Sequence, residues 1–202
     1  MITRRNFLET SLAGTLGAGV ILAASRSMST AGAPGPQRSA LHTAVVDLRF
    51  AESRRFGAAL DRLGTSVRTF EADVTALWFT QLDPMWRAER GPVAGLTAYG
   101  VLFCLERLAW DHGMRMVYRA EHEPLAEGGM QHTLPGAASA LAAELQMGGH
   151  LAWPRTVAQW LAQTPLTATQ AATSLTDIRL RTSERTRGAS RAAATLYSWV
   201  IA

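Results

Sequence analysis

Residues 43–70 read TAVVDLRFAESRRFGAALDRLGTSVRTF, and this stretch decides the fold class. The short apolar run at 43–48 is typical of a buried strand, and residues 51–63 carry their apolar side chains on one face of a helix. A second short run at 66–70 predicts another strand. A strand, a helix and a strand joined by short links form a βαβ unit, in which the two strands are parallel.

The pattern beyond this unit predicts further helices around the sheet. Their expected ranges are 73–82, which stops before Pro84, then 96–112, 137–147 and 154–163. A loop is expected at 88–95.

Beyond the βαβ unit, the sequence predicts few further strands. A third strand is expected at 114–122, and residues 130–134 would return beside it as an added hairpin. Residues 164–195 hold either a strand at 177–180 or a mobile loop, and 196–201 form a final strand or a hydrophobic tail. The expected architecture is therefore an α/β domain with a small three- to four-stranded sheet and helices packed around it.

The N-terminus carries a different kind of signal. Arg4 and Arg5 are followed by the apolar pair Phe7 and Leu8, and residues 11–24 are apolar or small. That run is shorter than the roughly 20 apolar residues that a membrane-spanning helix needs. The pattern resembles the twin-arginine (Tat) export signal of bacteria. The resemblance implies export of an already folded protein by the Tat translocase to the periplasm, with no stable membrane span.

This resemblance also sets the expected domain organisation. Residues 1–33 would be the signal peptide and its cleavage region, 34–41 a linker, and 42–202 a single α/β domain. Cleavage after Ala31 and cleavage after Ala33 both fit the preference for small residues. An N-terminal anchor, or a chance arginine pair before a soluble helix, is the alternative.

Composition excludes several classes of chemistry. The formal net charge is +4, and all 20 basic residues are arginine. Without lysine, the chain cannot form a Schiff base with pyridoxal phosphate or build a P-loop. The single cysteine, Cys104, excludes an internal disulfide, cysteine-ligated iron–sulfur clusters and covalent c-type haem. Cys104 lies among apolar residues and is expected to be buried and inert. No cofactor and no nucleic-acid partner are predicted.

Three carboxylates lie where the first two predicted strands end. Asp47 closes the first strand, and Glu71 and Asp73 follow the second. Ligands of open α/β sheets bind at this edge, so the three side chains could hold a divalent cation or act as a general base. The alternative is structural: Asp47 would pair with Arg49 or cap the helix, Asp73 would cap the next helix and Glu71 would be solvated.

Histidines provide the other candidates. His122 and His132 lie on the predicted hairpin, where they could meet across the two strands and bind a metal. A slip of one residue would put them on opposite faces, and surface charge is the alternative. Asp111 precedes His112 at the end of a predicted helix, but adjacent helical residues do not face each other, so a helix-end role is the alternative there.

Aromatic residues gather in one segment, with Trp78, Phe79 and Trp86 close together in the sequence. Core packing is the ordinary role of such residues. Trp86 is followed by Arg87 and Arg90, however, and this combination is typical of a surface that faces a partner.

The functional expectation combines these observations. The leading hypothesis is a soluble, Tat-exported periplasmic protein that acts as a non-catalytic binding or accessory protein of an exported partner. The alternative is a small, cofactor-poor enzyme that uses the acidic edge formed by Asp47, Glu71 and Asp73, with or without a divalent metal. A third hypothesis is an exported redox subunit with a non-covalent flavin. The sequence leaves open whether the protein is an enzyme.

Overall fold

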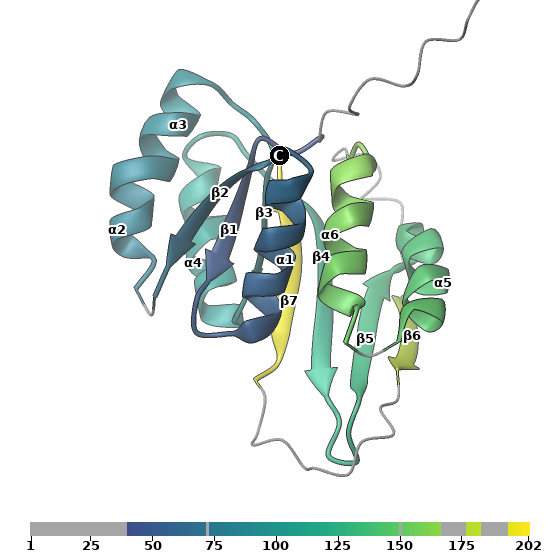
Figure 1. The fold of residues 1–202 in the computed structure, drawn as a ribbon. Helices are drawn as coiled ribbons and strands as arrows, with labels where there is room; N and C mark the ends of the chain where they lie inside the picture. The colour runs from purple at the N-terminus through teal and green to yellow at the C-terminus, as the bar shows by residue number, and fades with distance from the viewer. Residues whose placement is uncertain (1–39, 72, 150, 167–176, 183–193) are drawn as a thin grey trace, which may run out of the picture. The chain divides into compact units, whose positions relative to one another are not determined.

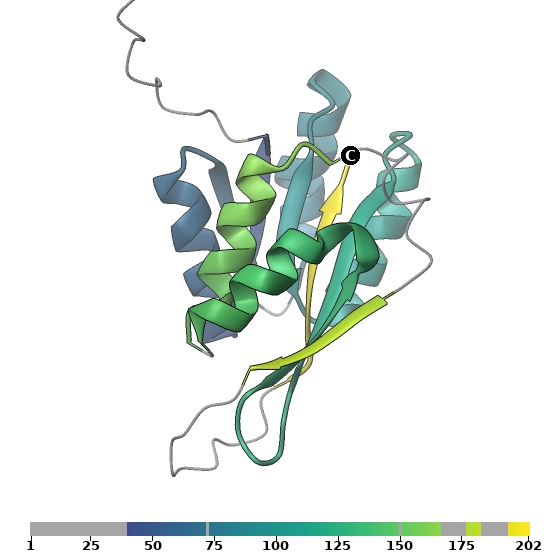
Figure 2. The same ribbon diagram turned by 90° about the vertical axis from the view of Figure 1, so that its right-hand side faces the viewer.

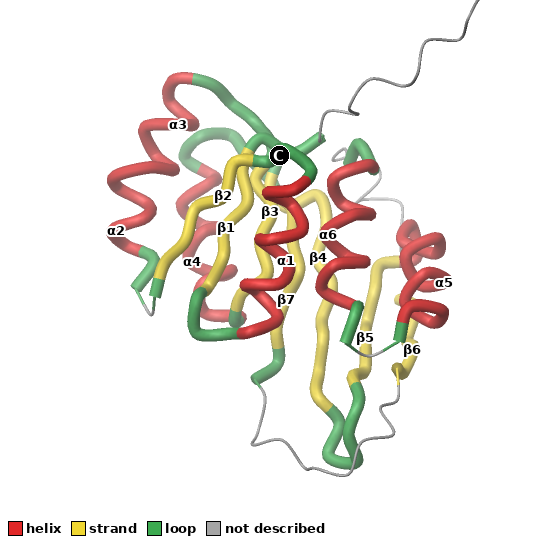
Figure 3. The backbone as a smooth tube through the Cα atoms, viewed as in Figure 1, coloured by secondary structure: helices red, strands yellow, loops and turns green. Residues whose placement is uncertain are grey.

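A computed structural model shows the arrangement of the elements. It describes residues 40–71, 73–149, 151–166, 177–182 and 194–202. All of them belong to one unit, residues 36–202. A central sheet carries helices on both faces, so the described residues form three layers (Figures 1 and 3). The α/β class predicted from the sequence is confirmed.

The size of the sheet corrects the prediction. The described residues form one seven-stranded mixed sheet in the order β2-β1-β3-β7-β4-β5-β6, not a small three- to four-stranded one. The strand that was missed is β3 (Val93–Thr97), which lies where a loop and the start of a helix were expected. All five of its residues are buried, so its side chains do not alternate between apolar and polar as in a half-exposed strand.

The first half of the sheet is parallel and follows the predicted βαβ unit. Strand β1 (Thr43–Asp47) continues through helix α1 (Ala51–Arg62) into β2 (Ser66–Phe70). Strand β1 pairs in parallel with both β2 and β3, so it lies between them.

The second half of the sheet is antiparallel. Strands β4 (Met116–Pro124) and β5 (Met130–Pro135) form the predicted hairpin, and β6 (Asp177–Thr182) pairs with β5. The last strand, β7 (Leu196–Ile201), lies between β3 and β4 and pairs antiparallel with both. The C-terminal strand therefore joins the two halves of the sheet. Of the region predicted as a strand or mobile loop, residues 167–176 and 183–193 lie outside the described residues.

Helices cover each face of the sheet over a separate apolar core (Figures 1 and 2). Helices α1, α5 (Ser139–Gly148) and α6 (Trp153–Gln163) pack on one face, and a short 3-10 turn, η2 (Gly136–Ala138), leads into α5. Helix α4 (Tyr99–Trp110) packs on the other face.

The segment beside α4 departs from the predicted helix end. Helix α2 (Thr75–Leu77) runs through a π-helical turn, η1 (Trp78–Leu82), into α3 (Asp83–Ala88). The expectation that the helix stops before Pro84 is wrong. Proline lies in the first turn of α3, where its missing N–H costs least, and the wider π-helical turn precedes it. Turns of this kind are frequent at functional sites.

Candidate functional site

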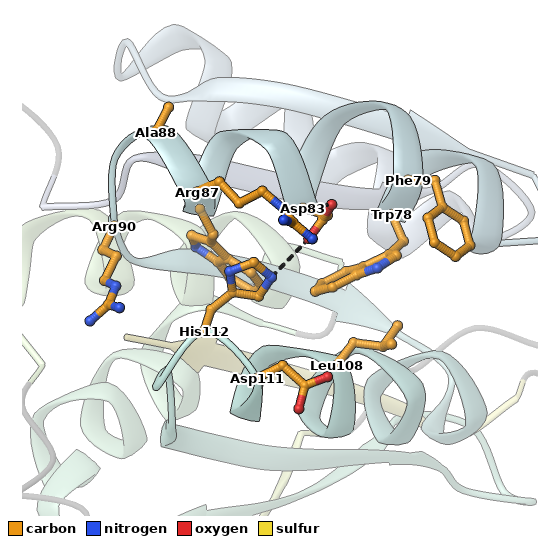
Figure 4. Close-up of a pocket in the computed structure, with 10 residues that line it drawn as sticks. Trp78, Phe79, Asp83, Arg87, Ala88, Arg90, Leu108, Asp111 and His112 are labelled. Atoms are coloured by element: carbon orange, nitrogen blue, oxygen red, sulfur yellow. Dashed lines mark hydrogen bonds and ion pairs between the residues drawn. The ribbon is translucent and has the colours of Figure 1, made fainter.

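A pocket of about 680 Å³ lies between the α2–α3 segment and the C-terminal end of α4 (Figure 4). Its apolar lining includes Trp78, Trp86 and Leu108, and its polar lining includes Asp83 and His112. The π-helical turn and the start of α3 supply one wall, and the last turn of α4 with the residues after it supplies the other.

A hydrogen bond between Asp83 and His112 joins the two walls. The Nε2 atom of His112 lies 3.0 Å from Oδ1 of Asp83, and the two side chains are only 11% and 18% exposed. Asp83 also accepts a hydrogen bond from Nε of Arg87, one helical turn later, at 3.0 Å. The carboxylate therefore fixes the orientation of both the imidazole and the guanidinium. Asp111, which the sequence suggested beside His112, does not make this contact in the structure.

Two tryptophans hold the imidazole in place. The ring centroid of His112 lies 5.6 Å from that of Trp78 and 5.8 Å from that of Trp86. The two indoles pack edge to face, 5.7 Å apart, and Trp86 donates its Nε1–H to the carbonyl of Gly91 at 3.0 Å. This part of the pocket is rigid, because each ring is fixed by the others.

Charged side chains surround the opening. Arg87 is 72% exposed, and Arg90 and Asp111 are also exposed. Within the described residues, neither Arg90 nor Asp111 forms an ion pair. Trp86 itself is buried, so of the group suggested as a partner-facing patch only the arginines reach the surface.

The carboxylates at the sheet edge have separate contacts. Asp47 is fully buried and forms a two-point ion pair with Arg49, through Nε at 2.9 Å and a terminal nitrogen at 2.6 Å. The hydrogen bond to Asp47 raises the pKa of the Arg49 guanidinium. Asp73 is exposed and accepts from Thr75 at the start of α2, and hydrogen bonds from Thr75 lower the pKa of Asp73. Glu71 is exposed.

The backbone does bring these residues to one edge, because Asp47 pairs with the last residue of β2. Arg49, however, occupies both oxygens of the Asp47 carboxylate. The acidic metal or general-base site stays a prediction.

His122 and His132 meet as the hairpin predicts. They are direct partners in β4 and β5, both are fully buried, and their Nδ1 atoms lie 2.7 Å apart. The alternative of surface charge is therefore wrong for both side chains. Nε2 of His122 lies 2.8 Å from the Ser198 hydroxyl, and Nε2 of His132 lies 3.2 Å from the Thr182 hydroxyl.

The surroundings of this pair favour neutral rings. Trp153 of α6 packs on His122 with ring centroids 4.4 Å apart. Burial, with the neighbouring His132 as a second cause, holds the pKa of His122 well below its usual value. Among the described residues, no group of three or more His, Cys, Asp or Glu side chains is arranged around a metal position. The two-histidine metal site stays a prediction.

Sequence reasoning missed two features of these sites. Asp83 was not singled out, because its partner His112 is 29 residues away and only the folded chain brings them together. Cys104 was expected to be buried, but it lies on the exposed side of α4. The angular position of Cys104 on that helix indicates this, because at about 100° per residue Cys104 lies about 100° away from Leu105, which is the centre of the face formed by the buried residues Val101, Leu105 and Ala109.

The residues of the export signal, Arg4, Arg5, Phe7 and Leu8, lie outside the described residues. In the ranges that the structure describes, no helix has the length and apolar character needed to cross a membrane. Comparisons with protein-family models, curated proteins and solved structures found no match for this chain.

Proposed function

We propose that the protein is exported through the Tat route to the periplasm and acts there as a binding or accessory protein. The pocket beside α4 is its ligand site. One observation carries this proposal: two tryptophans and the hydrogen-bonded pair of Asp83 and His112 line a rigid pocket that opens to solvent beside charged groups. Ligand sites combine apolar walls with a few fixed polar groups in this way.

A non-catalytic role fits the way the polar groups are used. Asp83 already binds both Arg87 and His112, so these side chains support one another. A small enzyme that uses Asp47, Glu71 and Asp73 is the alternative proposal. The ion pair between Asp47 and Arg49 gives that site less support than the pocket has.

An accessory role with an exported protein partner has its own support on α4. Tyr99, Phe103 and Trp110 lie on one side of this helix and are 52%, 44% and 43% exposed. The guanidinium of Arg107 lies over the rings of Phe103 and Trp110, at 5.2 and 4.0 Å from their centroids. Exposed aromatic residues with arginine are typical of protein-binding surfaces.

Native mass spectrometry of protein purified from the periplasm of its own host tests the ligand site. We expect a bound small molecule on the unaltered chain, and we expect Trp78→Ala to lose it. Met147→Ala is the matched control, because Met147 is 79% exposed and does not line the pocket. A chain without added mass, or a ligand that Trp78→Ala retains, would overturn the pocket as the functional site.

The export half of the proposal needs a separate measurement. In the Arg4→Lys/Arg5→Lys variant we expect the protein to remain in the cytoplasm with its full N-terminal segment. Periplasmic protein in unchanged yield from this variant would contradict the Tat route.

A further inference from the structure

The polar groups at the opening of the pocket differ between its two walls. Arg87 extends from α3, on the same wall as Asp83, and Asp111 extends from the end of α4, on the opposite wall (Figure 4). Trp78 and His112 lie between them (Figure 4). A ligand that spans this opening therefore meets a cationic end, an aromatic middle and an anionic end.

The cationic end has free N–H donors that can bind an acid. Asp83 holds Arg87 through its Nε atom, so the four N–H groups of its two terminal nitrogens remain for another acceptor. Arg90 lies in the loop that Trp86 fixes by its hydrogen bond to Gly91, and its guanidinium lies apart from that of Arg87 (Figure 4), so Arg87 is the group that defines this end. Guanidinium groups bind carboxylates through two parallel hydrogen bonds, so this end fits a carboxylate.

The anionic end is not explained by the stability of the fold. Asp111 is the C-terminal cap residue of α4, where the helix dipole disfavours a negative charge. Among the described residues it forms no ion pair that would offset this. A carboxylate kept at an unfavourable helix end, on the lining of a pocket, fits a role in receiving a hydrogen-bond donor from a ligand.

The middle of the pocket fits a flat, apolar group. Trp78 and Leu108 come from opposite walls, and the imidazole of His112 packs against both indoles, which also contact each other. Aromatic rings pack well against such surfaces in edge or offset arrangements.

From these three observations we infer that the pocket binds an aromatic acid that carries a hydrogen-bond donor at the end opposite its carboxylate. Arg87 binds the carboxylate, Trp78 and Leu108 contact the ring, and Asp111 accepts from the donor. This inference rests on the proposed function, because it names the chemistry of the ligand for the same pocket.

Calorimetric titration of the purified periplasmic protein with three matched probes tests it. 4-Hydroxyphenylacetate has the acid and the donor, phenylacetate lacks the donor, and 4-hydroxyphenylethanol lacks the acid. We expect 4-hydroxyphenylacetate to bind tightest, with Kd lower by about tenfold or more than for either of the others. Equal affinity for all three, or no binding of any at millimolar concentration, would overturn the inference.

Two variants assign the ends of the ligand. Asp111→Asn should weaken 4-hydroxyphenylacetate about tenfold and leave phenylacetate unchanged within about twofold. Arg87→Gln should weaken both acids and leave 4-hydroxyphenylethanol unchanged. Because the charge of Asp111 opposes the helix dipole, its removal should not lower the thermal unfolding midpoint, which separates lost binding from lost folding. Equal weakening of all probes by Asp111→Asn would contradict the assignment.

The two proposals can fail separately. If native mass spectrometry finds a ligand that depends on Trp78 while none of the three probes binds, the pocket stands and the ligand class is wrong. If no ligand depends on Trp78, the proposed function itself fails.

Discussion

The Nδ1 atoms of His122 and His132 lie 2.7 Å apart in the protein interior. A neutral imidazole has one donor and one acceptor nitrogen, so one ring donates its Nδ1–H to the other. The Tyr118 hydroxyl lies 3.4 Å from Ser198, which lies 2.8 Å from His122, and His132 continues the chain to Thr182. Donation in one direction along these five side chains satisfies every ring nitrogen without any buried charge.

The buried hydrogen-bond network around His122 predicts that acid destabilises the protein. The folded-state pKa of His122 lies well below the unfolded value of about 6.5, because burial disfavours the charged ring. Below pH 6.5 or so the unfolded chain therefore binds more protons than the folded one, and the free energy of unfolding falls as the pH is lowered. Urea unfolding followed by tryptophan fluorescence should show a lower midpoint at about pH 5.5 than at about pH 7.5.

The other titratable groups near His122 are consistent with this prediction. Within the described part of the chain, two titratable side chains belong to the same hydrogen-bond network as His122. His132 bonds it directly, and Tyr118 is linked to it by way of Ser198. Burial raises the pKa of Tyr118, so its hydroxyl stays neutral in this pH range. The variant His42→Ala, which removes an exposed histidine, is the reference for this measurement. An unfolding midpoint that stays constant or rises toward acid pH would contradict the prediction.

Two glycines should respond in opposite ways to the same substitution. A Cβ atom at Gly95 in β3 would overlap the indole of Trp199, so Gly95→Ala should destabilise the fold by about 1–3 kcal/mol or more. At Gly100, in the first turn of α4, a Cβ atom meets nothing within 4 Å, and alanine should stabilise the helix by up to about 1 kcal/mol. Urea unfolding measures the free energy of unfolding of both variants. Equal changes in the two would contradict the packing of β3 against β7.

Local patterns predicted the parts of the fold that depend on neighbouring residues. The βαβ unit at 43–70 and helix α6 have regular periodicity, and both are present. Strand β3 was missed because it is buried on both faces, and an apolar run of this length does not distinguish a strand from the start of a helix. The insertion of β7 depends on the pairing of Val93 with Ile201, which local periodicity does not show.

The candidate sites were also predictable only where their residues are close in sequence. His122 and His132 are close in sequence, and the hairpin pattern brought them together correctly. Trp78, Trp86 and His112 were each singled out, but their common pocket forms only when α3 packs beside the end of α4.

Asp47 should prove to be a structural residue. Its carboxylate is fully buried and accepts two hydrogen bonds from the Arg49 side chain. Asp47→Asn leaves that guanidinium without its partner, and we expect a loss of about 1–3 kcal/mol in the free energy of unfolding. Glu71→Gln, at an exposed position on the same sheet edge, should change it by less than about 0.5 kcal/mol. A result in which Asp47→Asn is neutral, or stabilising, would instead favour a functional carboxylate, since functional sites are often held at a cost in stability.

Cys104 should react in the folded protein. It lies on the exposed side of α4, so a thiol reagent such as dithionitrobenzoate should modify it without denaturant. The expected result is one equivalent of released thiolate in the native protein, and Cys104→Ser gives the blank. Reaction only after addition of urea would show that something covers this side of α4.

Trp86 links the rigid part of the pocket to the loop that carries Arg90. Its Nε1–H donates to the buried carbonyl of Gly91 at 3.0 Å. Trp86→Phe keeps an aromatic ring but leaves this carbonyl without its donor, which should lower the free energy of unfolding by about 1–3 kcal/mol. Hydrogen exchange should then become faster at the amides of residues 89–91, because the loop loses its attachment to α3. The control Trp110→Phe changes an indole that is 43% exposed and should alter stability by less than about 0.5 kcal/mol. Unchanged exchange at residues 89–91 in Trp86→Phe would mean that contacts other than this hydrogen bond position Arg90.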